Sequence, residues 1–80
     1  MGVKATKGQP EQRVKLGHRI SELRFEAGMS QIDLAREAGI SRAMMSAVEN
    51  GKYLPTLVSA KSLAKALGTT VDGLIDGIIE

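Results

Sequence analysis

The side chains that could do covalent or metal chemistry are few in this chain of 80 residues. Cysteine is absent and His18 is the single histidine, so disulfide scaffolds, zinc fingers, thiol nucleophiles and triads that pair histidine with cysteine are excluded. Gly51-Lys52 lacks the rest of a phosphate-binding glycine loop. We therefore expect a binding protein rather than an enzyme, with no metal, no cofactor and no small-molecule substrate.

The segment 41–50 has a polar pattern that is unusual for an exposed helix. At about 100° per residue, Met45 and Val48 share one face. The opposite face carries small and polar side chains: Ala43, Ser46, Ala47 and Asn50. Arg42 and Glu49 flank this face on one side and Met44 on the other. The face fits a groove about 12 Å wide, as in B-DNA, but from the residues alone packing against another helix or a second subunit is an equally good interpretation.

If this face enters DNA, its side chains have distinct capacities. Arg42, at the start of the segment, could bridge O6 and N7 of guanine, with a phosphate contact or a solvated side chain as the alternatives. Ala43 and Ala47 could touch a thymine methyl, and Ser46 could donate or accept. These four residues are the candidate base contacts. Because few of these side chains can form hydrogen bonds with bases, we expect much of the specificity to come from Arg42, from dimer spacing and from DNA shape.

Helical spacing predicts two helices before this segment. The first runs from Glu11, with an apolar stripe of Leu16, Ile20, Leu23 and Ala27, and ends at Gly28. The second begins at Ser30, where Asp33 three residues on forms a weaker capping box, and ends at Gly39. Only residues 39–41 separate it from the third helix, which Ser41 caps. So short a connection with a glycine is typical of a helix-turn-helix.

Two further helices are predicted after the loop 52–55. Thr56 caps the first of them. Its apolar face is expected to comprise Leu57, Ala60, Leu63, Ala64 and Leu67. Thr70 caps the last, whose apolar positions are Val71, Leu74, Ile75 and Ile78. The fold class is therefore all-α, a compact five-helix domain.

Charge and composition divide the chain unevenly. The net charge is +2, but residues 1–10 carry two lysines and no acid, whereas residues 70–80 carry three acids and no base. We expect a flexible basic tail over 1–10 and one domain over 11–80. No apolar run approaches the roughly 18 residues of a membrane span, and no signal peptide is evident. The expected location is the cytoplasm, without membrane contact.

An ordered set of residues then gives a family resemblance. The set comprises Arg24, Gly28, Ser30-Gln31, Leu34-Ala35, Ala38-Gly39-Ile40-Ser41, Met45, Val48-Glu49-Asn50-Gly51-Lys52, Pro55, Leu63-Ala64 and Ala66-Leu67-Gly68. With these residues and gaps, the stretch 17–79 resembles the DNA-binding domain of phage Cro and repressor proteins, the XRE-type helix-turn-helix family with the lambda-repressor-like fold. The resemblance favours insertion of the helix at 42–49 into the major groove.

The resemblance also implies roles for individual residues. Gln31 would contact phosphate and brace the next helix. Asn50 and Lys52 would contact phosphate, although Asn50 could also act purely as a helix cap. Arg24 and Glu49 would form an internal ion pair that joins the first helix to the third.

The resemblance implies a sequence-specific regulator of transcription that binds double-stranded DNA. We expect it to act as a homodimer on a two-fold operator, as a repressor. The expected dimer interface is Leu74, Ile75, Ile78 and Ile79, with packing back onto the first helix as the alternative. A second hypothesis is an antitoxin or another protein-binding module with the same fold. Such a module would need a longer disordered extension than the predicted ten-residue tail, which favours the DNA regulator.

Overall fold

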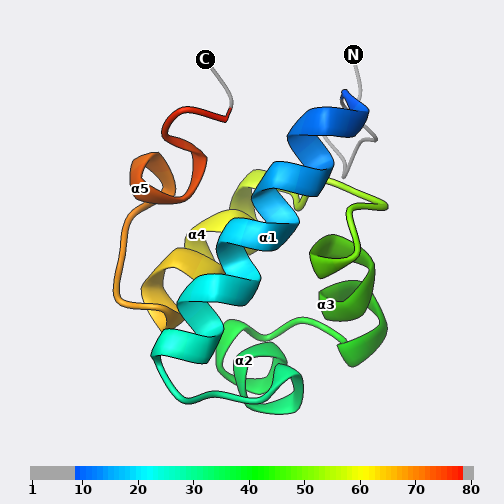
Figure 1. The fold of residues 1–80 in the computed structure, drawn as a ribbon. Helices are drawn as coiled ribbons and strands as arrows, with labels where there is room; N and C mark the ends of the chain where they lie inside the picture. Colours follow the sequence, from blue (N-terminus) through cyan, green and yellow to red (C-terminus); the bar gives the residue numbers. More distant parts are fainter. Residues whose placement is uncertain (1–8, 79–80) are drawn as a thin grey trace.

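The computed structural model describes residues 9–78, and these residues form five helices and no strand. The helices are α1 (Pro10–Glu26), α2 (Gln31–Ala38), α3 (Arg42–Glu49), α4 (Leu57–Ala66) and α5 (Val71–Ile75). Figure 1 shows α1 crossing in front of α4, with α3 on the right, α2 at the bottom and α5 on the left. The predicted all-α fold with a helix-turn-helix is confirmed.

Short polar side chains fix where the helices begin. The Ser30 hydroxyl accepts a bond from the Asp33 backbone N–H, and the Asp33 carboxylate accepts one from the Ser30 N–H, so the capping box predicted at this position is present. The bond from the Ser30 backbone lowers the pKa of Asp33. Hydroxyl caps also begin three later helices: Ser41 for α3, Thr56 for α4 and Thr70 for α5.

The connection between α2 and α3 is as short as the sequence predicts. Gly39 has a φ of 70°, a left-handed conformation that glycine adopts without steric penalty. The next residue, Ile40, donates its backbone N–H back to the carbonyl of Ala35. This bond satisfies one of the free carbonyls at the end of α2 and turns the chain directly into α3.

Both outer boundaries of the predicted fold need correction. Pro10 is the first residue of α1 and not the last of the tail, because the first helical position needs no backbone N–H. Gln9 is the N-cap of α1. Residues 1–8 of the predicted tail, and thus Lys4 and Lys7, lie outside the described residues. At the other end, α5 stops at Ile75 and does not reach Ile78. Gly77, with a φ of 75°, is in a left-handed turn that a helix cannot contain.

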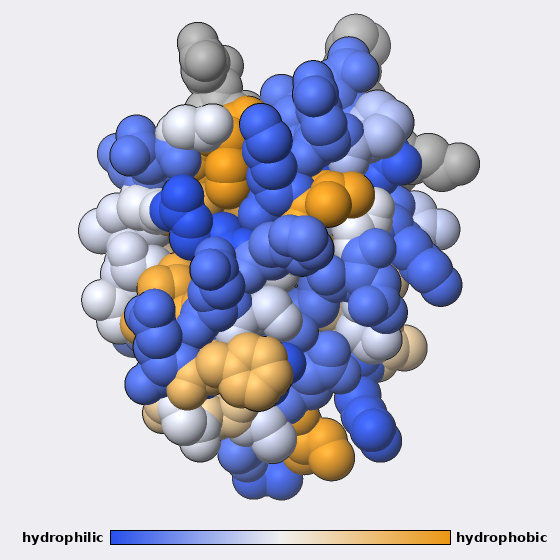
Figure 2. All heavy atoms as spheres, in the orientation of Figure 1, coloured by the Kyte–Doolittle hydropathy of each residue, from blue (hydrophilic) through white to orange (hydrophobic). Residues whose placement is uncertain are grey.

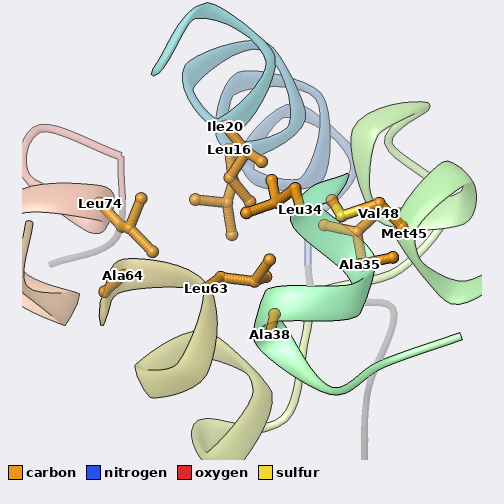
Figure 3. Packing of buried hydrophobic residues seen from close by; sticks show 10 residues of the cluster. All are labelled: Leu16, Ile20, Leu34, Ala35, Ala38, Met45, Val48, Leu63, Ala64 and Leu74. Carbon is orange, nitrogen blue, oxygen red and sulfur yellow. The ribbon is translucent and has the colours of Figure 1, made fainter. Parts of the chain in front are cut away.

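Side chains from all five helices meet in one core (Figure 3). Its buried members are Leu16, Ile20, Leu34, Ala35, Ala38, Met45, Val48, Leu63, Ala64 and Leu74. The expected apolar face of α4 is wrong at one residue, since Leu57 remains 70 % exposed. Leu57 is in the first turn of α4, where the core no longer covers the helix. None of the described helices is both long enough and apolar enough to cross a membrane.

Candidate nucleic-acid interface

Helix α3 divides into an inward and an outward face. Met45 and Val48 are fully buried, as their spacing predicts. Among the candidate base contacts, Arg42 and Ala43 are exposed, and Ser46 and Ala47 are partly exposed. The four side chains therefore share a face of one short helix that no other described helix covers completely. Their contact with bases remains a prediction.

A buried ion pair anchors the end of this helix. The Arg24 and Glu49 residues are each 8 % exposed. The Arg24 Nε donates to Glu49 Oε2 at 2.8 Å, and its Nη2 donates to Oε1 at 3.0 Å. The pair expected from the family resemblance is thus present, with both carboxylate oxygens engaged. It joins α1 to the last residue of α3.

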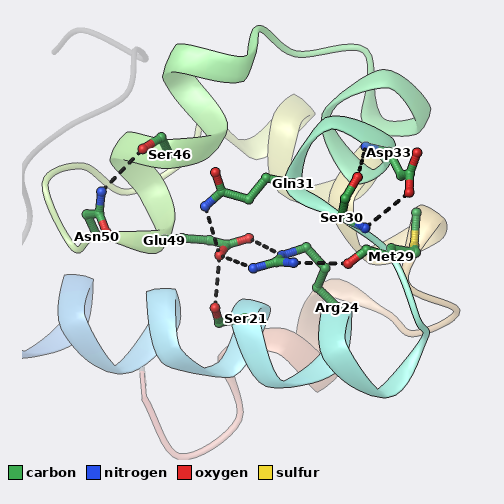
Figure 4. A network of polar contacts seen from close by, with 9 residues as sticks. All are labelled: Ser21, Arg24, Met29, Ser30, Gln31, Asp33, Ser46, Glu49 and Asn50. Atoms are coloured by element: carbon green, nitrogen blue, oxygen red, sulfur yellow. Dashed lines mark hydrogen bonds and ion pairs between the residues drawn. The ribbon is translucent and has the colours of Figure 1, made fainter.

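Three further hydrogen bonds extend the ion pair into a network (Figure 4). Ser21 Oγ of α1 donates to Glu49 Oε1 at 2.9 Å, and Gln31 Nε2 of α2 donates to the same oxygen at 3.1 Å. Arg24 Nη1 donates to the carbonyl of Met29 in the loop between α1 and α2 at 3.0 Å. One carboxylate therefore holds three helices together. We name Ser21, Arg24, Gln31 and Glu49 the Glu49 cluster.

Two opposing effects act on the Glu49 carboxyl. Burial raises its pKa, while hydrogen bonds from Arg24, Gln31 and Ser21 lower it, and the net result is a pKa below the ordinary value. The hydrogen bond to Glu49 raises the pKa of Arg24. Both residues are accordingly charged at neutral pH, as the pairing requires.

Gly17 lets α1 and α3 approach closely. A Cβ atom at this position would lie 2.5 Å from the Glu49 carbonyl oxygen and 2.7 Å from the Val48 carbonyl oxygen. These are backbone atoms, which cannot move aside as a flexible side chain can. Gly17 was not predicted from the sequence, because helical spacing marks apolar positions and does not identify the glycine that touches a neighbouring backbone.

The candidate phosphate contacts lie at two ends of the helix-turn-helix. Gln31 uses one N–H of its amide on Glu49, which leaves the second N–H for another acceptor. It braces α3 through this bond, as the resemblance implies. Asn50 and Lys52 are exposed just after α3. Arg13 Nε donates to the carbonyl of Gly51 at 2.9 Å and so ties this loop to α1. Contact with phosphate stays a prediction for all three candidates.

The candidate dimer interface is only partly available. Leu74 is 1 % exposed and belongs to the core of its own chain, so assigning it to the interface was wrong. Helix α5 packs against both α4 and α1, and Arg19 of α1 donates to the carbonyls of Gly73 and Asp76. Ile75 and Ile78 are partly buried, and Ile79 lies outside the described residues.

Other apolar side chains reach the surface away from α5. Phe25 at the end of α1 is 72 % exposed. On α4, the consecutive residues Leu57 and Val58 are 70 % and 75 % exposed. On the face that Figure 2 displays, apolar atoms form separate patches among hydrophilic ones rather than a continuous band. No signal in the sequence distinguished Leu57 from the buried positions of α4.

Comparisons with known proteins agree with this geometry. The model of the Helix-turn-helix family matches residues 20–74. A relative from Deinococcus deserti, the HTH-type transcriptional regulator DdrOP3, is 40 % identical over 65 residues, which cover 81 % of this chain and 50 % of the relative. The chain therefore spans half the length of that relative.

Two solved structures resemble the domain as a whole. The restriction-modification controller protein C.AhdI from Aeromonas hydrophila has a TM-score of 0.75 and 39 % identity, with 78 % of this chain and 94 % of the controller covered. SinR, a master regulator for biofilm formation solved in complex with DNA, has a TM-score of 0.71 and 31 % identity, with 76 % and 98 % covered. Both similarities span nearly the whole of the compared structure.

Proposed function

The chain belongs to the helix-turn-helix family, and from this premise we propose that it is a transcription regulator. It binds double-stranded DNA in a sequence-specific manner, as a homodimer on a two-fold operator, and represses by occupying that operator. The observation that carries the proposal is the outward face of α3, which is accessible, built from small side chains and headed by Arg42. The resemblance to SinR, which was solved with DNA, supports the same function.

The proposed binding mode assigns each group a task. Helix α3 enters the major groove, where Arg42 bridges O6 and N7 of a guanine. Ala43 and Ala47 keep the helix slim enough to approach thymine methyl groups, while Ser46 forms a single hydrogen bond with a base. The second amide N–H of Gln31, the amide of Asn50 and the ammonium of Lys52 contact phosphates and set the register of the helix on the duplex.

Dimerisation gives the operator its symmetry. We assign the two-fold contact to the apolar residues Ile75, Ile78 and Ile79 at the C-terminal end of the domain. Two copies of α3 then face half-sites about one helical turn apart, roughly 34 Å. A bound dimer excludes other proteins from the DNA that it covers, which is the basis of repression by occupancy.

Binding to the upstream DNA of its own gene tests the proposal. We expect specific binding whose affinity falls as salt rises, because each neutralised phosphate releases counterions. Arg42→Ala should relax the base preference at one position at a cost of about 1–3 kcal/mol. Lys52→Ala should weaken all sequences alike and reduce the log–log salt slope by just under one.

Lys61→Ala is the matched control, since Lys61 is an exposed lysine of α4 outside the proposed contacts. It should change neither the preference nor the slope. Salt-independent binding, or binding no tighter than to random DNA, would reject the operator and favour a protein-binding module with the same fold. Unchanged base preference in Arg42→Ala would reject the assignment of Arg42.

A further inference from the structure

Only two side chains on the outward face of α3 that we propose to meet bases can form hydrogen bonds with them, Arg42 and Ser46. Ala43 and Ala47 carry methyl groups alone. A serine hydroxyl has one proton to donate and lone pairs that accept, so an isolated serine accommodates either kind of base edge. The surroundings of the Ser46 hydroxyl therefore decide which base it favours.

Asn50 occupies one side of that hydroxyl. Its Nδ2 donates to Ser46 Oγ at 3.2 Å across one turn of helix (Figure 4). No described residue accepts a hydrogen bond from the Ser46 hydroxyl in return. The oxygen is thus engaged as an acceptor, while its proton remains available. A hydroxyl that accepts one bond is polarised toward donating another.

The electrostatics of the helix end favour this orientation of the Asn50 amide. Asn50 is the C-cap of α3, where backbone carbonyls without helical partners concentrate partial negative charge. The NH₂ group of the amide is attracted to that end, and the amide oxygen is repelled from it. The hydrogen bond to Ser46 therefore runs from Asn50 to Ser46.

We propose that Asn50 makes Ser46 a hydrogen-bond donor toward DNA, so that the protein selects against cytosine at the position that Ser46 faces. In the major groove guanine O6 and N7, thymine O4 and adenine N7 accept hydrogen bonds, whereas cytosine presents only its N4 donor. The inference rests on the proposed function and adds a base class to it. Asn50 is then a positioning residue for base selection as well as a candidate phosphate contact.

Selection from a randomised pool of duplex DNA tests this inference. The wild-type chain should deplete cytosine at one position of the half-site, and Ser46→Ala should reduce that discrimination about fivefold, the loss of one hydrogen bond. In Asn50→Asp the carboxylate accepts a hydrogen bond from the Ser46 hydroxyl. The lone pairs of the Ser46 oxygen then face the groove as acceptors. Cytosine should then be enriched at the same position, because an accepting hydroxyl pairs with its N4 donor.

Two further variants separate this effect from general weakening. Asn50→Asp also adds a negative charge near DNA, so the base preference is scored at each position relative to the others. In the double variant Ser46→Ala with Asn50→Asp the shift should disappear, and Asn50→Ala, which removes the bond without adding charge, should merely flatten the preference. Retained helical content and thermal midpoint verify folding.

The outcomes are distinguishable from failure of the proposed function. If the wild type enriches no sequence at all, the proposed function itself fails. If the wild type enriches a site and Asn50→Asp still depletes cytosine at the Ser46 position, the inference is overturned and the DNA-binding function stands. The inference is likewise overturned if Ser46→Ala leaves the base preference unchanged at every position.

Discussion

At the scale of single residues, the Glu49 carboxylate connects three helices through its hydrogen bonds. It accepts hydrogen bonds from Ser21, Arg24 and Gln31, which belong to two different helices, while it stands on a third. Glu49 is 8 % exposed, so its charge has little water to replace a lost partner. This makes its ionisation a condition for the docking of α3.

Removing the charge of Glu49 should therefore be costly. We expect Glu49→Gln to lower the free energy of unfolding by about 3–5 kcal/mol, because it leaves the guanidinium of Arg24 buried without a counter-charge. Urea unfolding measures the loss. In a double-mutant cycle with Arg24→Met, the two losses should not add. As a control, the exposed carboxylate variant Glu22→Gln should stay within about 0.5 kcal/mol of the wild type. A similarly small loss in Glu49→Gln would contradict the role assigned to the pair.

The direction of the Glu49 pKa shift predicts how stability varies with pH. Its pKa is lower in the folded chain than the ordinary value of about 4.3. The stabilisation is therefore fully present above that ordinary value and is lost as pH falls through the folded pKa. Unfolding free energies measured from pH 7 down to pH 3 should decline below about pH 5. Glu49→Gln should make this decline in unfolding free energy less steep, and Asp33, whose pKa is also lowered, should still contribute to it. An unchanged slope would show that Glu49 does not contribute to the pH dependence.

Which side chains meet at Glu49 was only partly predictable from the sequence. The pair Arg24–Glu49 and the bracing role of Gln31 followed from the family resemblance. Ser21 did not, because a serine within a helix has no local signal for a partner 28 residues away. Leu74 and Leu57 show that helical spacing alone does not predict burial. Both occupy apolar positions of a predicted helix, but Leu74 is in the core and Leu57 is exposed.

At the scale of helices, α3 is too short to be stable alone. Eight residues are fewer than the roughly 12–15 that an isolated helix needs in water, so packing must hold it in place. Met45 and Val48 provide this packing on one side, the Glu49 cluster fixes the end, and Gly17 permits the close approach of α1. The geometry of the outward face depends on all three.

Gly17→Ala should separate helix propensity from helix packing. Alanine favours a helix by about 1 kcal/mol over glycine, but here its Cβ would clash with two backbone oxygens. We expect a net loss of about 1–3 kcal/mol in unfolding free energy, together with weaker DNA binding as α3 shifts. His18→Ala, at the exposed next residue, is the control and should leave both unchanged. A stabilised Gly17→Ala chain would show that the α1–α3 contact can relax at no cost.

The helix starts capped by a hydroxyl were the part of the fold that local rules predicted best. Ser30, Ser41, Thr56 and Thr70 each cap the helix expected from the sequence, since capping involves residues only three positions apart. The end of α5 was predicted wrongly, because the apolar spacing continues to Ile78 while the backbone turns at Gly77. A helical spacing of apolar residues can extend beyond the last residue of the helix itself.

At the scale of the whole molecule, the modest net charge of +2 conceals a separation of functions. The stretch from Arg36 to Lys65 contains the proposed DNA contacts except Gln31 and more basic than acidic residues, whereas Asp72 and Asp76 lie at the end assigned to the dimer contact. A weakly charged protein can thus present a locally basic surface to phosphate. Composition alone did not reveal this arrangement, which needed the position of α3.

The oligomeric state tests the assignment of the C-terminal end. Ile78→Asp should shift the mass measured by sedimentation equilibrium from dimer to monomer, because the charge would be buried in an apolar contact. Val58→Asp is the matched control, with an apolar side chain 75 % exposed on α4. Dissociation by Val58→Asp instead would place the two-fold contact on α4. An unfolding midpoint recorded for both variants separates dissociation from loss of the fold.

The division of α3 into an inward and an outward face has a consequence for how such a protein can change over generations. Met45, Val48 and Glu49 hold the helix, while Arg42, Ala43, Ser46 and Ala47 take no part in the core or in the Glu49 cluster. Substitutions at the second set leave the first untouched. In the proposed binding mode, a handful of codon changes can therefore retarget the protein to a new operator without passing through an unfolded ancestor, and the same separation offers engineers four positions to randomise on an intact scaffold.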